Sequence, residues 1–212
     1  MSSNALPSRL HSFPLVLLCS LLVMSGCTTA PVETAVDNPQ LTWQSRQPEL
    51  AAIKVWRLSG RVAVSQGGEA WNLNMDWQQD GDDYQIQLYG PFGSGRVKLV
   101  GNAYGVLLHD ADDQTFYADK AQTLLYEHTG VTMPVEGLRY WIVGLTSPTQ
   151  SKQPRLDSQG RLAYLEDANW QVNFKRYTDV SGMQLPHKVF IVEPDNQIDV
   201  RLVIDTWKLG AL

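Results

Sequence analysis

The sequence predicts a mainly β protein of the α+β class, in which one strongly curved antiparallel sheet packs against a few helices. Two observations lead to this prediction. Stretches on both sides of residues 120–145 alternate between apolar and polar residues, as half-buried strands do. Short turns join many of these stretches, and neighbouring strands joined in this way form antiparallel meanders. The folded part is expected to be a single domain spanning residues 39–212.

The first 26 residues predict a removable export signal. Arg9 and the free amino terminus supply positive charge, and residues 13–23 (FPLVLLCSLLV) are almost wholly apolar. This run is shorter than the roughly 20 residues that a membrane-spanning helix needs. It fits the apolar segment of a secretory signal peptide. A buried core helix is the alternative, which the extreme terminal position and the preceding positive charge disfavour.

Residues 23–27 (VMSGC) resemble the bacterial lipobox, in which the cysteine is acylated and becomes the first mature residue. Met24 departs from the leucine that is usual there. The alternative is an ordinary small-residue cleavage site with an incidental cysteine. Because Cys19 lies inside the signal, Cys27 would be the only mature cysteine and could form no intramolecular disulfide. Lipidation at Cys27 explains this lone thiol and predicts a lipid anchor.

Residues 27–38 are expected to comprise the acylated cysteine and a flexible tether, because TTAPVETAVDN is small, polar and without periodicity. Thr28 follows the cysteine, where an aspartate is associated with inner-membrane retention, so outer-membrane sorting is expected. Removal of residues 1–26 deletes only Arg9 among the charged residues and leaves 16 basic and 22 acidic residues. This acidic balance argues against nucleic-acid binding.

The domain is expected to begin with a short helix in residues 39–55, broken or begun near Pro48. Strands are predicted at residues 56–65, 70–78 and 84–88, where apolar and polar residues alternate. Further strands are expected at residues 97–100, 106–108, 162–165, 170–174, 185–192 and 198–207. Two helices are expected between these groups of strands, at residues 120–129 with Gly130 as C-cap and at residues 134–145.

The sequence contains no motif typical of an enzyme. His109, His128 and His187 are far apart and lie outside any metal-ligand pattern. Ser94 lies between glycines but forms no G-x-S-x-G elbow. The loop GPFGSG, residues 90–95, precedes a strand, whereas a phosphate-binding loop precedes a helix. No enzymatic activity, cofactor or metal site is therefore expected.

The lipobox, the tether and the meander with its glycine-rich loop together resemble the LolB family of outer-membrane lipoprotein receptors. Residues 129–145 (TGVTMPVEGLRYWIVGL) and 169–177 (NWQVNFKRY) are similar to a helical segment and a strand of that family. The resemblance covers nearly the whole mature chain in the same element order. It implies a half-open antiparallel β-barrel with helices covering a hydrophobic cavity.

The resemblance also implies a function. A lipid-anchored protein on the periplasmic face of the outer membrane would accept lipoproteins from a soluble LolA-like carrier and insert them into the inner leaflet, without nucleotide. The expected partners are the carrier, the acylated cargo and outer-membrane lipids, and a monomer is expected. The alternative is a structural or assembly outer-membrane lipoprotein without an acyl-binding cavity. A soluble carrier of the same fold is disfavoured by Cys27.

The glycine-rich loop contains one large apolar residue, Phe92, between Pro91 and Gly93. In the family, a protruding apolar residue of this loop, commonly leucine, is linked to membrane targeting, and the resemblance carries that role to Phe92. The alternative is that Phe92 folds back onto the sheet. Candidates for the lining of the acyl cavity, chosen by strand face and residue type, are Trp71, Leu73, Met75, Trp77, Ile86, Leu88 and Trp141.

Overall fold

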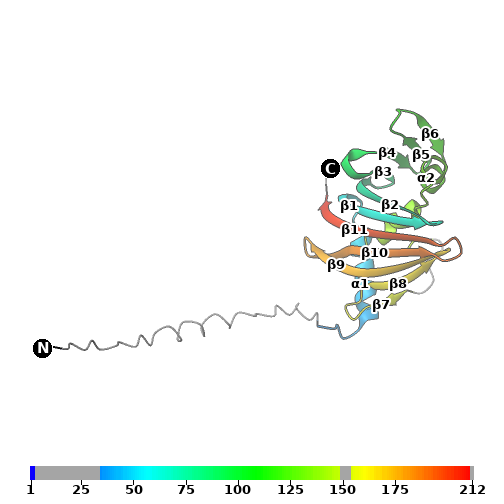
Figure 1. Ribbon diagram of the computed structural model, residues 1–212. Coiled ribbons are helices and arrows are strands. Elements are labelled where there is room, and N and C mark those ends of the chain that lie inside the picture. Colours follow the sequence, from blue (N-terminus) through cyan, green and yellow to red (C-terminus); the bar gives the residue numbers. More distant parts are fainter. Residues whose placement is uncertain (3–33, 149–153, 211–212) are drawn as a thin grey trace. The chain divides into compact units, whose positions relative to one another are not determined.

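The computed structural model describes residues 1–2, 34–148 and 154–210, and the residues from Thr34 onward form one compact unit. Its framework is an open 11-stranded antiparallel sheet in the order β6-β5-β4-β3-β2-β1-β11-β10-β9-β8-β7 (Figure 1). The predicted signal peptide and Cys27 lie outside the described residues. The strands are β1 (Val55–Gln66), β2 (Glu69–Asp80), β3 (Asp83–Tyr89), β4 (Val97–Asn102), β5 (Gly105–His109), β6 (Thr115–Ala118), β7 (Arg155–Leu156), β8 (Leu162–Asp167), β9 (Trp170–Val180), β10 (Met183–Glu193) and β11 (Ile198–Leu209).

The sheet consists of two meanders that meet at its centre. Strands β1 to β6 follow one another outward to one edge, and β7 to β11 lead back from the other edge to β1. The first and last strands of the domain pair antiparallel, with Leu58 opposite Trp207 and Val62 opposite Leu202. The predicted curved antiparallel sheet is confirmed, and the pairing of β1 with β11 joins the two meanders into one structure.

The central strand pair contains a bulge at Gly60. The register between β1 and β11 shifts between Ser59 and Gly60, which bends the strand locally. A Cβ atom added at Gly60 would lie 2.4 Å from the carbonyl oxygen of Val203. This contact is with backbone and cannot be relieved by a rotamer change, so glycine is required where the two strands approach.

The helix α1 (Pro39–Ala51) starts where the sequence predicts but is not broken at Pro48. The side chain of Asn38 accepts a hydrogen bond from the Leu41 amide at 3.1 Å, and Pro39 occupies the first turn, where its missing N–H costs nothing. Pro48 lies near the C-terminal end, and α1 stops at Ala51 rather than continuing to residue 55. Just before α1, the Val36 amide donates to the Ser158 carbonyl oxygen at 2.9 Å, so the described end of the predicted tether contacts the domain.

Helices α2 (Ala121–Thr129) and α3 (Val135–Trp141) follow β6. Gly130 caps α2 in the left-handed conformation with φ 72°, as its position in the sequence predicts. The helix α3 is shorter than the predicted span of residues 134–145. The chain leaves α3 through a turn that contains Gly144 at φ 84°, so the apolar residues 142–145 are buried or half-buried in a turn and not in a helix.

The two edge strands β6 and β7 were not predicted from the sequence. Strand β6 has four residues and β7 has two, which is too short for an alternating pattern to emerge. Pairing with β5 and β8, and not local sequence preference, makes these segments extended.

The core lies between the inner face of the sheet and the helices. Alternate residues of each strand face inward, so Trp56, Leu58, Val62 and Val64 of β1 are all buried. Helix α2 packs on β5 and β6, and the inward residues of β8 to β11 complete the same cluster. The interior of the curved sheet is therefore filled with apolar side chains, with α2 and α3 packed into it.

Candidate functional site

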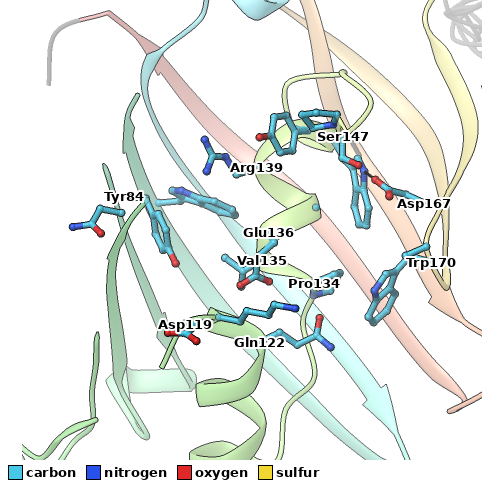
Figure 2. Close-up of a pocket in the computed structure, with 18 of the residues that line it drawn as sticks. Tyr84, Asp119, Gln122, Pro134, Val135, Glu136, Arg139, Ser147, Asp167 and Trp170 are labelled. Atoms are coloured by element: carbon cyan, nitrogen blue, oxygen red, sulfur yellow. Dashed lines mark hydrogen bonds between the residues drawn. The ribbon is translucent and has the colours of Figure 1, made fainter. Parts of the chain in front are cut away.

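A pocket of about 450 Å³ lies around helix α3, between the two halves of the sheet (Figure 2). Its walls come from strands β2 to β5 on one side, from the turn between β8 and β9 on the other, and from α3 and the start of α2 between them. The residues that line it are Trp77, Tyr84, Asn102, Gly105, Asp119, Lys120, Gln122, Pro134, Val135, Glu136, Gly137, Arg139, Tyr140, Trp141, Ser147, Pro148, Asp167, Ala168 and Trp170.

Three polar contacts connect α3 to its surroundings. Glu136 Oε1 accepts from the Ala121 amide at the start of α2 at 2.7 Å, and Arg139 Nη2 donates to Asp82 Oδ1 in the β2–β3 turn at 2.7 Å. Trp141 Nε1 donates to Asp167 Oδ2 at the end of β8 at 3.1 Å (Figure 2). These contacts reach three separate parts of the fold. They hold the seven-residue helix between the sheet halves.

The two aspartates that contact α3 differ in how far they are buried. The Arg139 guanidinium, through its hydrogen bond first and its charge second, holds the pKa of the exposed Asp82 carboxyl below its ordinary value. Asp167 is buried, while Asp82 is exposed. An ion pair at the surface is weak because water screens it. The Arg139–Asp82 contact is thus only a weak restraint on the position of α3.

Glycines make room for two of the aromatic walls. A Cβ atom at Gly101 would lie 2.3 Å from the ring of Tyr84, its partner across β3 and β4. A Cβ atom at Gly137 would lie 2.5 Å from the indole of Trp141, one turn further along α3. Each ring thus occupies the space that a side chain at the glycine would need. A larger residue at either position would displace the ring into the pocket.

Burial raises the pKa of Tyr84 to about 12, and the negative charge of Glu136 adds to the effect. A raised phenol pKa means that the fold favours the neutral form. This contribution to stability is complete below pH 10 and is lost between pH 10 and about 12, because the unfolded chain becomes charged at Tyr84 in this range while the folded protein still holds the phenol neutral.

We therefore expect the Tyr84→Phe variant to lose less stability than the wild-type protein as pH rises from 10 to about 12. Denaturant unfolding across this range, with a difference spectrum for the phenolate, measures the effect. Tyr104→Phe, which alters an exposed tyrosine, is the matched control. A Tyr84→Phe curve parallel to the wild-type curve would contradict the expectation.

The structure separates the seven candidate lining residues into three groups. Trp77 and Trp141 line the pocket. Met75, Ile86 and Leu88 are buried in the packed core next to it, and Trp71 and Leu73 are half-buried near the start of β2. The alternation along the strands thus predicted which side chains point inward, but only two of the seven residues line the pocket around α3.

Several residues of the pocket and its surroundings were not predicted from the sequence. Glu136 and Arg139 stand three positions apart in the otherwise largely apolar stretch of residues 134–145, which is a signal that polar contacts hold that helix. Asp82 and Asp167 gave no signal, because aspartates in turns usually form local hydrogen bonds. Their role depends on where the turns lie relative to α3.

The glycine-rich loop between β3 and β4 projects its apolar residue into solvent. Residues 91–93 form a single 3-10 turn, in which the Gly93 amide donates to the Gly90 carbonyl oxygen at 3.1 Å. The Gly90 amide donates to the Ser94 carbonyl oxygen at 2.7 Å and closes the loop. Phe92 is fully exposed and adopts φ 57°, a left-handed conformation that is unusual for a non-glycine residue. The ring therefore does not fold back onto the sheet.

The surroundings of Phe92 are polar or small. The Ser94 hydroxyl donates to the Pro91 carbonyl oxygen at 3.0 Å, which stiffens the loop, and Arg96 lies over the ring of Tyr89 at 5.6 Å. A strained backbone that displays a large apolar ring is stable only when the local hydrogen bonds define it closely. The loop displays Phe92 as an isolated apolar tip.

Other kinds of site find little support in the described part of the chain. Residues 34–148 and 154–210 contain no group of three His, Cys, Asp or Glu side chains placed to hold a metal ion. No helix within these ranges has the length and apolar character that crossing a membrane requires. The three histidines lie apart, with Nδ1 of His109 near the Thr115 hydroxyl and Nδ1 of His187 near the Ile204 carbonyl oxygen.

Comparison with known proteins agrees with this architecture. The family model described as outer membrane lipoprotein LolB matches residues 54–207. An outer-membrane lipoprotein LolB from Nitrosococcus oceani is 38% identical over 196 residues, covering 92% of this chain and 96% of the relative. Another from Alkalilimnicola ehrlichii is 35% identical over 190 residues, covering 89% and 93%.

The fold is shared more widely. The crystal structure of a LolA superfamily protein from Nitrosomonas europaea superimposes with a TM-score of 0.53 at 10% identity, covering 80% of this chain and 94% of that one. At this identity the likeness concerns the fold alone. The family model and the two relatives agree over nearly the whole domain, and the chain therefore belongs to the LolB family of outer-membrane lipoproteins.

Proposed function

We propose that this protein is a lipid-anchored receptor of the outer membrane that accepts lipoproteins from a LolA-like periplasmic carrier and inserts them into the inner leaflet. The observation that carries the proposal is the apolar interior of the open sheet, with α3 held across it by polar contacts at the pocket. Family membership supports the same function.

The interior must open before it can hold acyl chains. Trp77, Ile86 and Leu99 are completely buried, so the volume beneath α3 is already filled by protein. The pocket around α3 lies within the range of about 300–1,000 Å³ that is common for small-molecule sites. We infer that acyl chains enter beside α3 and that the helix shifts away from the sheet to make room for them.

Transfer needs only a difference in affinity. A buried methylene contributes about 0.8 kcal/mol, so a long acyl chain in water costs on the order of 10 kcal/mol and needs a protein cavity to cross an aqueous space. Cargo moves from the carrier to this protein if the second cavity binds it more tightly. Nucleotide hydrolysis is not required for such a step.

The remaining parts of the proposal concern the membrane. Acylation of Cys27 would fix the protein to the outer membrane, with residues 28–38 as the tether. Phe92, together with Pro91 and Gly93, would enter the lipid interface and direct the release of cargo there. The full exposure of Phe92 on a stiff loop supports this role.

A transfer assay tests the proposed function. Cargo-loaded carrier is mixed with the mature chain carrying Cys27→Ala, which lacks the lipid anchor, and the cargo is located after separation of the two proteins. We expect the cargo to move to this protein without nucleotide. If the cargo remains on the carrier and the protein binds no fatty acid, the chain is better described as a structural outer-membrane lipoprotein, which a packed interior would also suit.

Release of α3 should increase acyl binding. In the Arg139→Gln variant the contact with Asp82 loses its ionic character, and the helix keeps its other two connections. Because a surface ion pair is weak, we expect the affinity for a fluorescent fatty acid to rise about two- to fivefold. Fluorescence titration of the mature Cys27→Ala chain measures this change.

Arg61→Gln is the matched control for Arg139→Gln. Arg61 Nη2 pairs with Asp205 Oδ1 at 2.9 Å on the outer face of the sheet, away from the pocket. It is also an arginine–aspartate ion pair, but it does not contact α3. Equal effects of the two substitutions would mean that net charge, and not the position of α3, governs acyl binding.

A further inference from the structure

Asp167 is a buried carboxylate in the wall of the pocket. It ends β8 and lines the pocket, yet only 5% of its surface is exposed. Its Oδ2 accepts a hydrogen bond from Trp141 Nε1 at 3.1 Å. Among the residues that the structure describes, no cation pairs with this carboxylate, and Oδ1 has no hydrogen-bond donor. One indole N–H is thus its only described partner.

The two neighbouring carboxylates of the pocket differ from Asp167. Glu136 already accepts from the Ala121 amide, and Asp119 is exposed to water. A carboxyl group has two oxygens that can accept hydrogen bonds, and a buried polar group is costly unless it is hydrogen-bonded. Asp167 is therefore the group in this pocket that gains most from a ligand with N–H donors.

The surroundings of Asp167 specify what such a ligand looks like. Trp170 and Pro134 lie in the same pocket and offer an aromatic and an aliphatic wall (Figure 2). Trp141 lines this pocket as well. A fatty acid suits these walls but brings no N–H group to the carboxylate. The N-terminus of a lipoprotein does bring one, because acyl chains there adjoin the amide of the first residue and the next peptide bond.

We propose that Asp167 forms a polar subsite that accepts N–H donors from the lipidated N-terminal segment of the cargo, while the acyl chains lie on the aromatic and aliphatic walls. The inference rests on the receptor function proposed above. It adds a means by which the protein distinguishes an acylated peptide from free fatty acid and other lipids.

The test compares three ligands on the mature Cys27→Ala chain by quenching of tryptophan fluorescence. They are a tripalmitoylated cysteinyl peptide, the same peptide methylated on its first two amide nitrogens, and palmitate. We expect the wild-type protein to bind the unmethylated peptide about tenfold more tightly than the methylated one, because the methyl groups remove the donors. Equal affinities for the two peptides would overturn the proposal, whatever the behaviour of any variant.

Asp167→Asn replaces the carboxylate by an amide of the same shape that can still accept from Trp141. We expect it to lose about tenfold in affinity for the unmethylated peptide and to bind palmitate as the wild type does. Asp205→Asn, which removes an equal charge from the outer face of the sheet and not from the pocket, should retain the preference for the unmethylated peptide. Equal weakening of peptide and palmitate by Asp167→Asn would show a merely structural role and overturn the proposal.

A fourth ligand separates peptide N–H donors from those of a lipid headgroup. If Asp167→Asn weakened the binding of dioctanoyl phosphatidylethanolamine but not of the lipopeptide, the carboxylate would serve a lipid ammonium group and the proposal would be wrong. If neither lipopeptide nor palmitate bound the wild-type protein, the receptor function itself would fail, which the palmitate titration reveals separately.

Discussion

Phe92→Glu is expected to slow the insertion of cargo into liposomes by about 10- to 100-fold while leaving acceptance of cargo from the carrier intact. Burial of a phenylalanine side chain contributes about 1.5–3 kcal/mol, and 1.4 kcal/mol corresponds to a factor of ten. Phe92 is fully exposed and touches no part of the core, so the substitution should not alter the fold. The rate of cargo transfer to liposomes, measured separately from binding, tests this expectation.

Two further variants at the same position separate the apolar ring from the backbone strain. Phe92→Leu keeps an apolar tip and should insert cargo at a rate near that of the wild type. Phe92→Gly removes the tip but suits the observed φ of 57°, so it should match the glutamate variant in transfer and equal or exceed the wild type in stability. Normal insertion by both Phe92→Glu and Phe92→Gly would eliminate the loop as the membrane contact.

Trp77→Ala is expected to lower the free energy of unfolding by about 3–5 kcal/mol, which is typical for a large aromatic residue deleted from a core. Trp77 is completely buried, packs against Trp56 with ring centroids 5.5 Å apart, and donates to Gln79 Oε1 at 2.9 Å. Its removal leaves a cavity and takes the indole donor from the buried side chain of Gln79. The shift in the midpoint of urea unfolding measures this loss.

Trp71→Ala is the matched control, because it changes the same residue type on the same face of the same strand. Trp71 is only half-buried, so its removal should cost much less than that of Trp77. Similar losses for the two variants would mean that Trp77 lies in a loosely packed region and not in the core. Because Trp77 also lines the pocket, Trp77→Ala should enlarge the volume available to a fatty acid.

The alternating residues of β1, β2 and β3 allowed much of the sheet to be predicted. Side chains on successive strand residues point to opposite faces, so an apolar residue at every second position identifies the inward face from local sequence alone. Trp77 and Ile86 were assigned to that face and are buried there. The C-cap at Gly130 could also be predicted from local sequence, because the left-handed position after a helix favours glycine.

The candidate site was less predictable, because it depends on contacts between distant parts of the chain. Trp141 and Asp167 are 26 positions apart, and Arg139 and Asp82 are 57 positions apart. No local pattern indicates that the β2–β3 turn, the β8–β9 turn and the start of α2 surround one short helix. The lining candidates were therefore right about the inward direction of side chains but could not separate packed core from pocket.

The sequence by itself determined the mainly β architecture, the inward face of each long strand, the lipobox-like motif at Cys27 and the resemblance to the LolB family. Only the tertiary structure decided that β11 pairs with β1, that α3 fills the space between the sheet halves, and that Phe92 projects into solvent. The physical reason is that periodicity records which side of an element is apolar. What covers that side depends on packing between segments far apart in the chain.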